Sequence, residues 1–126
     1  MWQAKKQKYH AQKIVIDGID FPSKKEARRW MELLLLQKAG EIEGLRRQVR
    51  FELIPAQYAP DVVTKTGKKK RGACLERKCD YIADFVYSDL RTGETVVEDA
   101  KGMKTEVYKI KRKLMLYIHG IRVKEV

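Results

Sequence analysis

The chain has 126 residues, which is the size of one domain with a single hydrophobic core. Its 28 Lys and Arg outnumber its 17 Asp and Glu, so the net charge is +11 at pH 7. A charge of that sign and size is typical of proteins that bind a polyanion, most simply a nucleic acid; solubility alone is the alternative. No apolar run approaches the ~20 residues of a membrane-spanning helix, so we expect no membrane partner.

The N-terminus and the cysteine content bear on the cellular compartment. Nothing at the N-terminus resembles a signal peptide. The two cysteines, Cys74 and Cys79, fit a reducing cytoplasm. A structural zinc site needs four ligands as a rule, and His10 and His119 are far away in sequence. We therefore expect a cytoplasmic protein without zinc.

The first elements predicted are an arm and a hairpin. Residues 1–12 are polar and basic, and we expect a flexible arm that either follows a phosphate backbone or is a disordered terminus. The single domain then covers residues 13–126. It opens with strands over 13–16 and 19–21, because Asp17-Gly18 is a favoured two-residue turn.

A long helix is predicted over residues 24–39. Ser23 and Glu26 have the spacing of a capping box, and Gly40 is a suitable helix end. Apolar residues at intervals of three and four predict the buried stripe, which consists of Ala27, Trp30, Met31, Leu34 and Leu35.

A strand is predicted over residues 48–54, after a short connection over 42–45 and before Pro55. Gln48 stands near the start of this strand. It is either an ordinary surface residue or a hydrogen-bonding group for a water or phosphate at a site.

Residues 58–78 carry no decisive pattern, but 65–71 hold five positive charges and a glycine. We interpret them as a mobile hairpin tip. Like charges crowd there unfavourably without an anion, so we expect Lys68, Lys69, Lys70 and Arg71 to contact a DNA backbone; a solvated loop is the alternative.

Two strands over 81–87 and 94–102, joined by a turn over 88–93, form the stretch that carries chemistry. Side chains alternate between the faces of a strand, so Asp99 and Lys101 share a face. Asp84 lies between apolar neighbours, where a carboxylate is costly unless it is paired or binds a metal. If the strands are neighbours, Asp84 and Asp99 meet beside Lys101. Such a set can hold a divalent cation and a polarised water next to a phosphate; a buried Asp–Lys pair that only joins two strands is the alternative.

The C-terminal part predicts a helix over 106–118 with Thr105 as N-cap, then a strand over 121–126 after Gly120. The predicted buried stripe consists of Val107, Ile110, Leu114 and Tyr117. The basic residues in and before this helix are candidates for holding a phosphate backbone, with a solvated face as the alternative: Lys104, Lys109, Lys111 and Arg112.

Asp84, followed by Asp99-Ala100-Lys101 on the next strand, resembles the motif of the PD-(D/E)XK nuclease superfamily, with Ala83 where the superfamily label has Pro. The predicted order over residues 22–126 is similar to the αβββαβ core of that superfamily. The chain also resembles a branch of small, basic, phage- and prophage-borne proteins related to archaeal-type Holliday-junction resolvases. The resembling stretches include Phe21-Pro-Ser-Lys-Lys-Glu-Ala and Val97-Glu-Asp-Ala-Lys-Gly.

The resemblance implies an α/β (α+β) fold, like that of restriction endonucleases, with a central mixed sheet flanked by helices and with the hairpin added at the N-terminus. It implies that Mg²⁺ or Mn²⁺ binds Asp84, Asp99, the Ala100 carbonyl and Glu26, although Glu26 has the helix cap as an alternative role. Lys101 would position a water or stabilise charge on phosphorus.

The function implied is a DNA endonuclease in a bacterial host cell, acting on branched DNA as a homodimer in phage recombination or replication. Other flap, nicking or repair nucleases on the same fold, a non-catalytic DNA-binding protein and an RNA-binding module are the alternatives.

Overall fold

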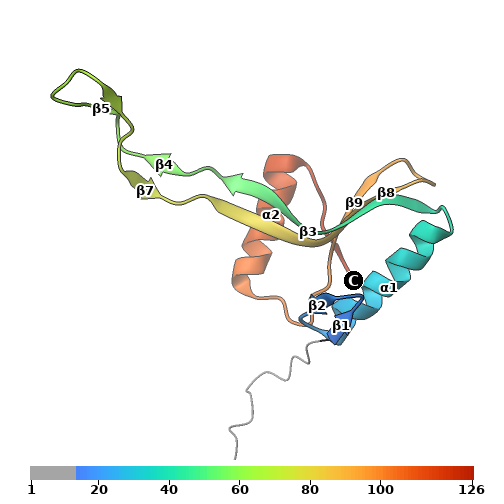
Figure 1. Cartoon of the computed structure of the whole chain (residues 1–126). Coiled ribbons are helices and arrows are strands. Elements are labelled where there is room, and N and C mark those ends of the chain that lie inside the picture. Colours follow the sequence, from blue (N-terminus) through green and yellow to red (C-terminus); the bar gives the residue numbers. More distant parts are fainter. Residues whose placement is uncertain (1–13) are drawn as a thin grey trace, which may run out of the picture. The chain divides into compact units, whose positions relative to one another are not determined.

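The computed structural model describes residues 14–126, and these fall into two compact units. One unit holds the described residues up to Leu45 together with Tyr87–Thr95, and the other holds Arg46–Val86 together with Val96–Val126. The arm predicted over 1–12 and the first hairpin residue, Lys13, lie outside the described residues. Over residues 14–126 the fold is α+β, with an N-terminal hairpin, two helices and a central mixed sheet, as expected (Figure 1).

The N-terminal hairpin has the predicted turn. Strands β1 (Ile14–Ile16) and β2 (Ile19–Phe21) pair antiparallel, and the turn residues Asp17 and Gly18 have φ angles of 49° and 76°. Positive φ at both central positions is what an Asp-Gly turn provides. The hairpin contacts helix α1, where the ring centroids of Phe21 and Trp30 are 6.2 Å apart.

Helix α1 (Lys24–Lys38) begins at its predicted cap, because the Ser23 hydroxyl accepts a hydrogen bond from the Glu26 backbone N–H at 3.2 Å. Ala39 is the C-cap, and Gly40 follows with φ 77°. The predicted stripe was wrong at Met31 and Leu35, which are exposed. Four consecutive leucines leave the choice of face open in the sequence. The buried residues are Glu26, Ala27 and Leu33.

The central sheet has the strand order β10-β9-β8-β3 within residues 14–126. Its strands are β3 (Ile42–Ile54), β8 (Cys79–Asp89), β9 (Thr95–Asp99) and β10 (Lys124–Glu125). Strand β10 runs parallel to β9, with Glu125 opposite Asp99. Strands β8 and β9 are joined by a turn in which the Asp89 N–H donates to the Glu94 carbonyl at 2.8 Å.

Three predicted strand boundaries were wrong. Residues 42–45 belong to β3 and are not a connection, because Gly44 and Gln48 have positive φ angles and break the alternation that would reveal one continuous strand. Strand β9 ends at Asp99, so Lys101 follows the strand. The last strand keeps two residues of the six predicted, since only Lys124 and Glu125 pair with β9.

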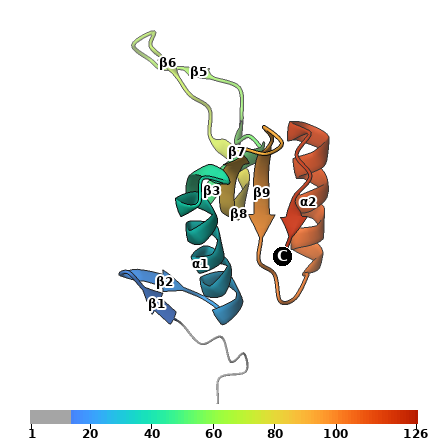
Figure 2. The ribbon, with the colours of Figure 1, turned by 90° about the vertical axis from the view of Figure 1, so that its right-hand side faces the viewer.

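Residues 57–76, named the ribbon below, form a two-stranded excursion between β3 and β8 (Figures 1 and 2). Strand β4 (Gln57–Tyr58) pairs antiparallel with β7 (Cys74–Glu76), and β5 (Val62–Val63) pairs antiparallel with β6 (Lys69–Lys70). The predicted basic tip is therefore part of a paired structure, in which the Thr64 N–H donates to the Lys68 carbonyl at 2.8 Å.

Helix α2 (Glu106–His119) has the predicted caps, with the Thr105 hydroxyl accepting from the Tyr108 N–H at 3.1 Å and with Gly120 at φ 65°. Its predicted stripe was wrong at Val107, Ile110 and Tyr117, which are exposed, whereas the fourth predicted residue, Leu114, packs against the core. Apolar residues occur on several faces of this helix, so the pattern fits two stripes. Burial selects Tyr108 and Met115, which join the core of the second unit: Leu53, Tyr81, Ala83, Val86, Val97 and Val123. Within residues 14–126, neither helix is both long enough and apolar enough to cross a bilayer.

Candidate functional site

Two acidic residues from neighbouring strands define the candidate site. Asp84 lies in β8 and is partly buried, and Asp99 is the last residue of β9 and is 1% exposed. The pKa of Asp84 is raised above its ordinary value, first by burial and also by the negative charge of Asp99. The two carboxylates therefore interact, as the sequence predicts.

Asp99 has one satisfied oxygen and one unsatisfied oxygen. The Tyr81 hydroxyl donates to Oδ2 at 2.6 Å, a short bond of the kind made to a charged acceptor. Oδ1 is buried and has no hydrogen-bond partner among the described residues. Its nearest cation is the Lys101 ammonium, with Nζ 3.7 Å away. A buried carboxylate oxygen without a hydrogen bond is costly, and a bound divalent cation would satisfy it.

Asp84 is held by two donors. Its Oδ2 accepts from the Ala100 backbone N–H at 2.8 Å, and its Oδ1 accepts from the Gln48 side-chain amide at 3.4 Å. These bonds and Lys101 oppose the rise in the Asp84 pKa without cancelling it. Gln48 has a φ angle of 51°, a left-handed backbone that is rare for a residue with a side chain. This left-handed residue lies within β3, at the position where the Gln48 side-chain amide donates to Asp84.

A pocket of about 240 Å³ lies beside this pair and is basic. It is lined by Tyr81, Ile82, Lys101, Thr105, Val107, Tyr108 and Lys111. The Lys101 ammonium also lies 5.3 Å from the centre of the Tyr108 ring, a cation–π distance. Lys111 is partly buried and forms no ion pair with another described residue. The pocket thus places two ammonium groups where a phosphate-sized anion fits.

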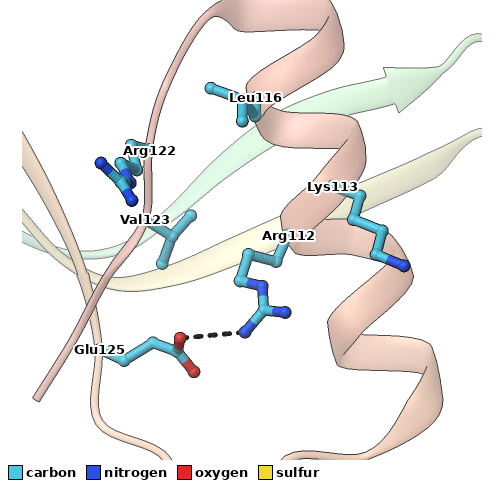
Figure 3. Close-up of a pocket in the computed structure, with 6 residues that line it drawn as sticks. All are labelled: Arg112, Lys113, Leu116, Arg122, Val123 and Glu125. Carbon is cyan, nitrogen blue, oxygen red and sulfur yellow. Dashed lines mark hydrogen bonds and ion pairs between the residues drawn. The ribbon is translucent and has the colours of Figure 1, made fainter.

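Other basic residues predicted to bind DNA are held by acids. The Glu125 carboxylate forms ion pairs with Lys104 at 3.1 Å and with Arg112 at 3.0 Å. The Arg112–Glu125 pair is in a second pocket, of about 280 Å³ (Figure 3). Partial burial alone would raise the pKa of Glu125, but these two cations lower it below its ordinary value. Lys109 pairs with Glu106 along the helix at 3.1 Å.

Glu26 belongs to the other unit and is 3% exposed. Its backbone N–H is held by Ser23, which bears out the first half of the capping box. Within residues 14–126 no group of three or more His, Cys, Asp or Glu side chains is placed to hold a metal ion. Of the residues predicted to bind a metal, the structure brings together Asp84, Asp99 and Ala100, whose backbone N–H donates to Asp84. Cys74 and Cys79 are free thiols.

The comparison with known families covers nearly the whole chain. The family model described as "Protein of unknown function (DUF1064)" matches residues 6–124. The chain belongs to the DUF1064 family. Neither a curated protein nor a solved structure matches it. The site of this DUF1064 protein is therefore interpreted from its own residues.

In the DUF1064 chain, Asp84, Asp99, Ala100 and Lys101 come together as predicted. Gln48, for which a surface position was the alternative, joins them through its bond to Asp84. The predicted DNA-binding residues Lys68, Lys69, Lys70 and Arg71 belong to the ribbon, where Arg71 lies 3.7 Å from the centre of the Tyr58 ring. Tyr81 was not predicted. The hydrogen bond of its hydroxyl to Asp99 depends on how β8 and β9 are paired, which the sequence alone does not reveal.

Proposed function

We propose that this protein is a metal-dependent DNA endonuclease that hydrolyses phosphodiester bonds, acts on branched DNA and works as a homodimer. The observation that carries the proposal is the buried, unsatisfied Oδ1 of Asp99, which lies beside Asp84 and Lys101. Two interacting carboxylates with an open oxygen form a cation site, and an adjacent ammonium on a basic pocket suits a phosphate substrate.

The chain's own residues would divide the work as follows. Asp99, held by Tyr81, and Asp84, held by Ala100 and Gln48, would bind Mg²⁺ or Mn²⁺. Once bound, the ion would polarise the scissile phosphate and lower the pKa of a water. Lys101 would stabilise negative charge that develops on the phosphate oxygens.

The charge of the surface supports a nucleic-acid substrate. The net charge of +11 attracts a polyanion from a distance, and Lys111, which has no ion pair within residues 14–126, adds a cation at the pocket beside Asp99. Lys104 and Arg112 share the single carboxylate of Glu125, so each would contact a phosphate fully only after exchanging that carboxylate for it.

The element order supports a restriction-endonuclease-like core as part of this proposal. Without the hairpin and the ribbon, the described order is α1, β3, β8, β9, α2, β10, an αβββαβ series. The two carboxylates lie on its second and third strands, and Lys101 lies two residues after Asp99. That arrangement is similar to the PD-(D/E)XK pattern.

Cleavage of labelled DNA tests the function. A four-way junction, a flap and a matched duplex are incubated with the protein in Mg²⁺, Mn²⁺ or EDTA. We expect paired cuts in the junction that require metal and fall at least about 100-fold in Asp99→Asn and Lys101→Ala, because each removes a group that stabilises the transition state.

The matched control is Asp89→Asn, a substitution of the same type at the end of β8, where Asp89 Oδ1 accepts from the Arg91 N–H. An asparagine oxygen can accept the same bond, so cleavage should not change. Cuts confined to the flap or the duplex would keep the nuclease and reassign its substrate. Tight DNA binding without cleavage in any metal would refute the enzyme and leave a DNA-binding protein.

A further inference from the structure

The ribbon is built without a core of its own. Val62 is 52% exposed and Val63 is 70% exposed, and Leu75 and Tyr58 are exposed as well. An isolated two-stranded hairpin is only marginally stable in water. A chain that keeps apolar side chains on such an excursion leaves surface that a partner would cover.

The charge of the ribbon identifies the chemistry of that partner. Five cations occur within residues 65–71. The nearest acid in the chain, Asp61, is engaged, because its Oδ1 accepts from the Gly72 N–H at 3.4 Å. Lys68, Lys69 and Lys70 are exposed and form no ion pair with another described residue. A polyanion is therefore the favoured partner. A protein surface with few acidic residues, or a second copy of this basic chain, would not supply the negative charge that these lysines attract.

The pairing of β5 with β6 shows that both faces of the ribbon have the same composition. Val63 lies opposite Lys69, and Val62 lies opposite Lys70. Residues directly opposite share a face, and successive residues point to opposite faces. Each face thus carries one valine beside one lysine. Whichever of these faces docks on a partner therefore presents an apolar and a basic side chain together.

The ribbon also has hydrogen bonds and close backbone contacts of its own that define its shape. The Ala59 N–H donates to the Ala73 carbonyl at 2.8 Å, and the Lys68 N–H donates to the Thr64 hydroxyl at 3.1 Å. Gly72 lies so close to the Ala59 and Pro60 carbonyls that a Cβ would clash with both. Order of this kind reduces the entropy lost on binding.

We propose that the ribbon enters the major groove of duplex DNA, with one face, and therefore one of its two valines, against the bases and with its lysines on the flanking phosphates. This inference rests on the proposed function, since it assumes DNA as the partner. The strands of a ribbon are about 4.8 Å apart, and the major groove, about 12 Å wide, admits a two-stranded β-ribbon.

The test measures binding without cleavage. Anisotropy of a fluorescein-labelled duplex is recorded in EDTA over a range of salt concentrations. The double variant Val62→Thr/Val63→Thr keeps β-branched residues, so the ribbon keeps its strands. We expect it to bind about tenfold more weakly, because polar hydroxyls replace buried methyl groups, with the salt dependence unchanged. Lys69→Gln/Lys70→Gln should reduce the slope of log K against log salt by about 2.

The matched control is Val15→Thr, since Val15 is 64% exposed on β1 and is also a strand valine. It should bind like the wild type. Methylation of guanine N7 by dimethyl sulfate reports the major groove directly, and the wild type should protect the bound guanines while the valine double variant protects fewer.

Several results would overturn the inference. Unchanged affinity in the valine variant, with a lower salt slope in the lysine variant, would mean that the ribbon follows the backbone outside the groove. A change of oligomeric state in light scattering, with DNA affinity intact, would assign the ribbon to a second copy. No duplex or junction binding by the wild type would refute the proposed function itself, whereas binding and cleavage that ignore the ribbon variants would refute only its insertion.

Discussion

Removing the Tyr81 hydroxyl tests whether the buried carboxylate of Asp99 depends on one hydrogen bond. Tyr81 is 2% exposed and Asp99 is 1% exposed, so water has no ready access to either group. In Tyr81→Phe, Oδ2 would lose its donor at 2.6 Å while Oδ1 already lacks one. Among residues 14–126, the remaining contact of the carboxylate with a donor group would be Lys101 at 3.7 Å.

The expected loss follows from the type of bond. A hydrogen bond to a charged group contributes about 1.5–3 kcal/mol. Removing the donor alone costs more than removing both partners, because a buried acceptor is left unsatisfied. The short distance favours the upper half of that range, so the free energy of unfolding should fall by about 2–3 kcal/mol. For a chain of this length, each kcal/mol lowers Tm by about 4 °C, which gives a fall of about 8–12 °C.

Urea denaturation and calorimetry without metal measure this loss. Tyr117→Phe is the matched control, because it removes the hydroxyl of an exposed tyrosine on α2 and should leave stability within about 0.5 kcal/mol. Binding of Mn²⁺ gives a second measurement, and loss of a group that orients a metal ligand typically weakens affinity about 10–100-fold. A Tm within about 2 °C of wild type, with Mn²⁺ affinity unchanged, would refute the argument.

Three further outcomes are expected. Burial raises the pKa of Asp84, so the stability that its protonated form contributes is complete at low pH and is lost as pH rises through the pKa of the folded state. Asp84→Asn should therefore unfold at a higher urea concentration than wild type at neutral pH, and the two proteins should be equally stable below about pH 3.5. Gly72→Ala should speed amide exchange throughout the ribbon by steric clash while the amides of β8 and β9 stay protected; uniform exchange would contradict it. Glu125→Gln should tighten duplex binding a few fold in low salt and have no effect in high salt, because it releases Lys104 and Arg112. If the variant and the wild type bind with equal affinity at low salt as well as at high salt, that release does not occur.

Local signals predicted the parts of the fold that local chemistry determines. The Asp17-Gly18 turn, the Ser23 and Thr105 caps and the glycines after both helices depend on a few adjacent residues, and each is in place. The buried faces of the helices depend on what packs against them. Both helices are apolar on more than one side, so spacing alone selected the wrong stripes at Met31 and Ile110.

The candidate site likewise has one part that local sequence signals predict and another that depends on tertiary contacts. Asp84, Asp99 and Lys101 were predicted because alternation and a short turn place them together. Tyr81 and the contact of Gln48 with Asp84 depend on register and on an irregular backbone, which composition does not encode. The ion pairs of Glu125 likewise join residues that are distant in sequence, so the pairing of Lys104 and Arg112 with it could not be predicted.

The left-handed backbone at Gln48 has a consequence for how this position evolves. A residue with a side chain loses about 1 kcal/mol there relative to glycine, which adopts that conformation freely. A library randomised at this codon and selected only for survival after heating should converge on glycine. The same library selected for the activity of the site should keep glutamine, since only a long amide reaches Asp84. The residue found at this codon would then show whether a population had been selected for stability or for the activity of the site.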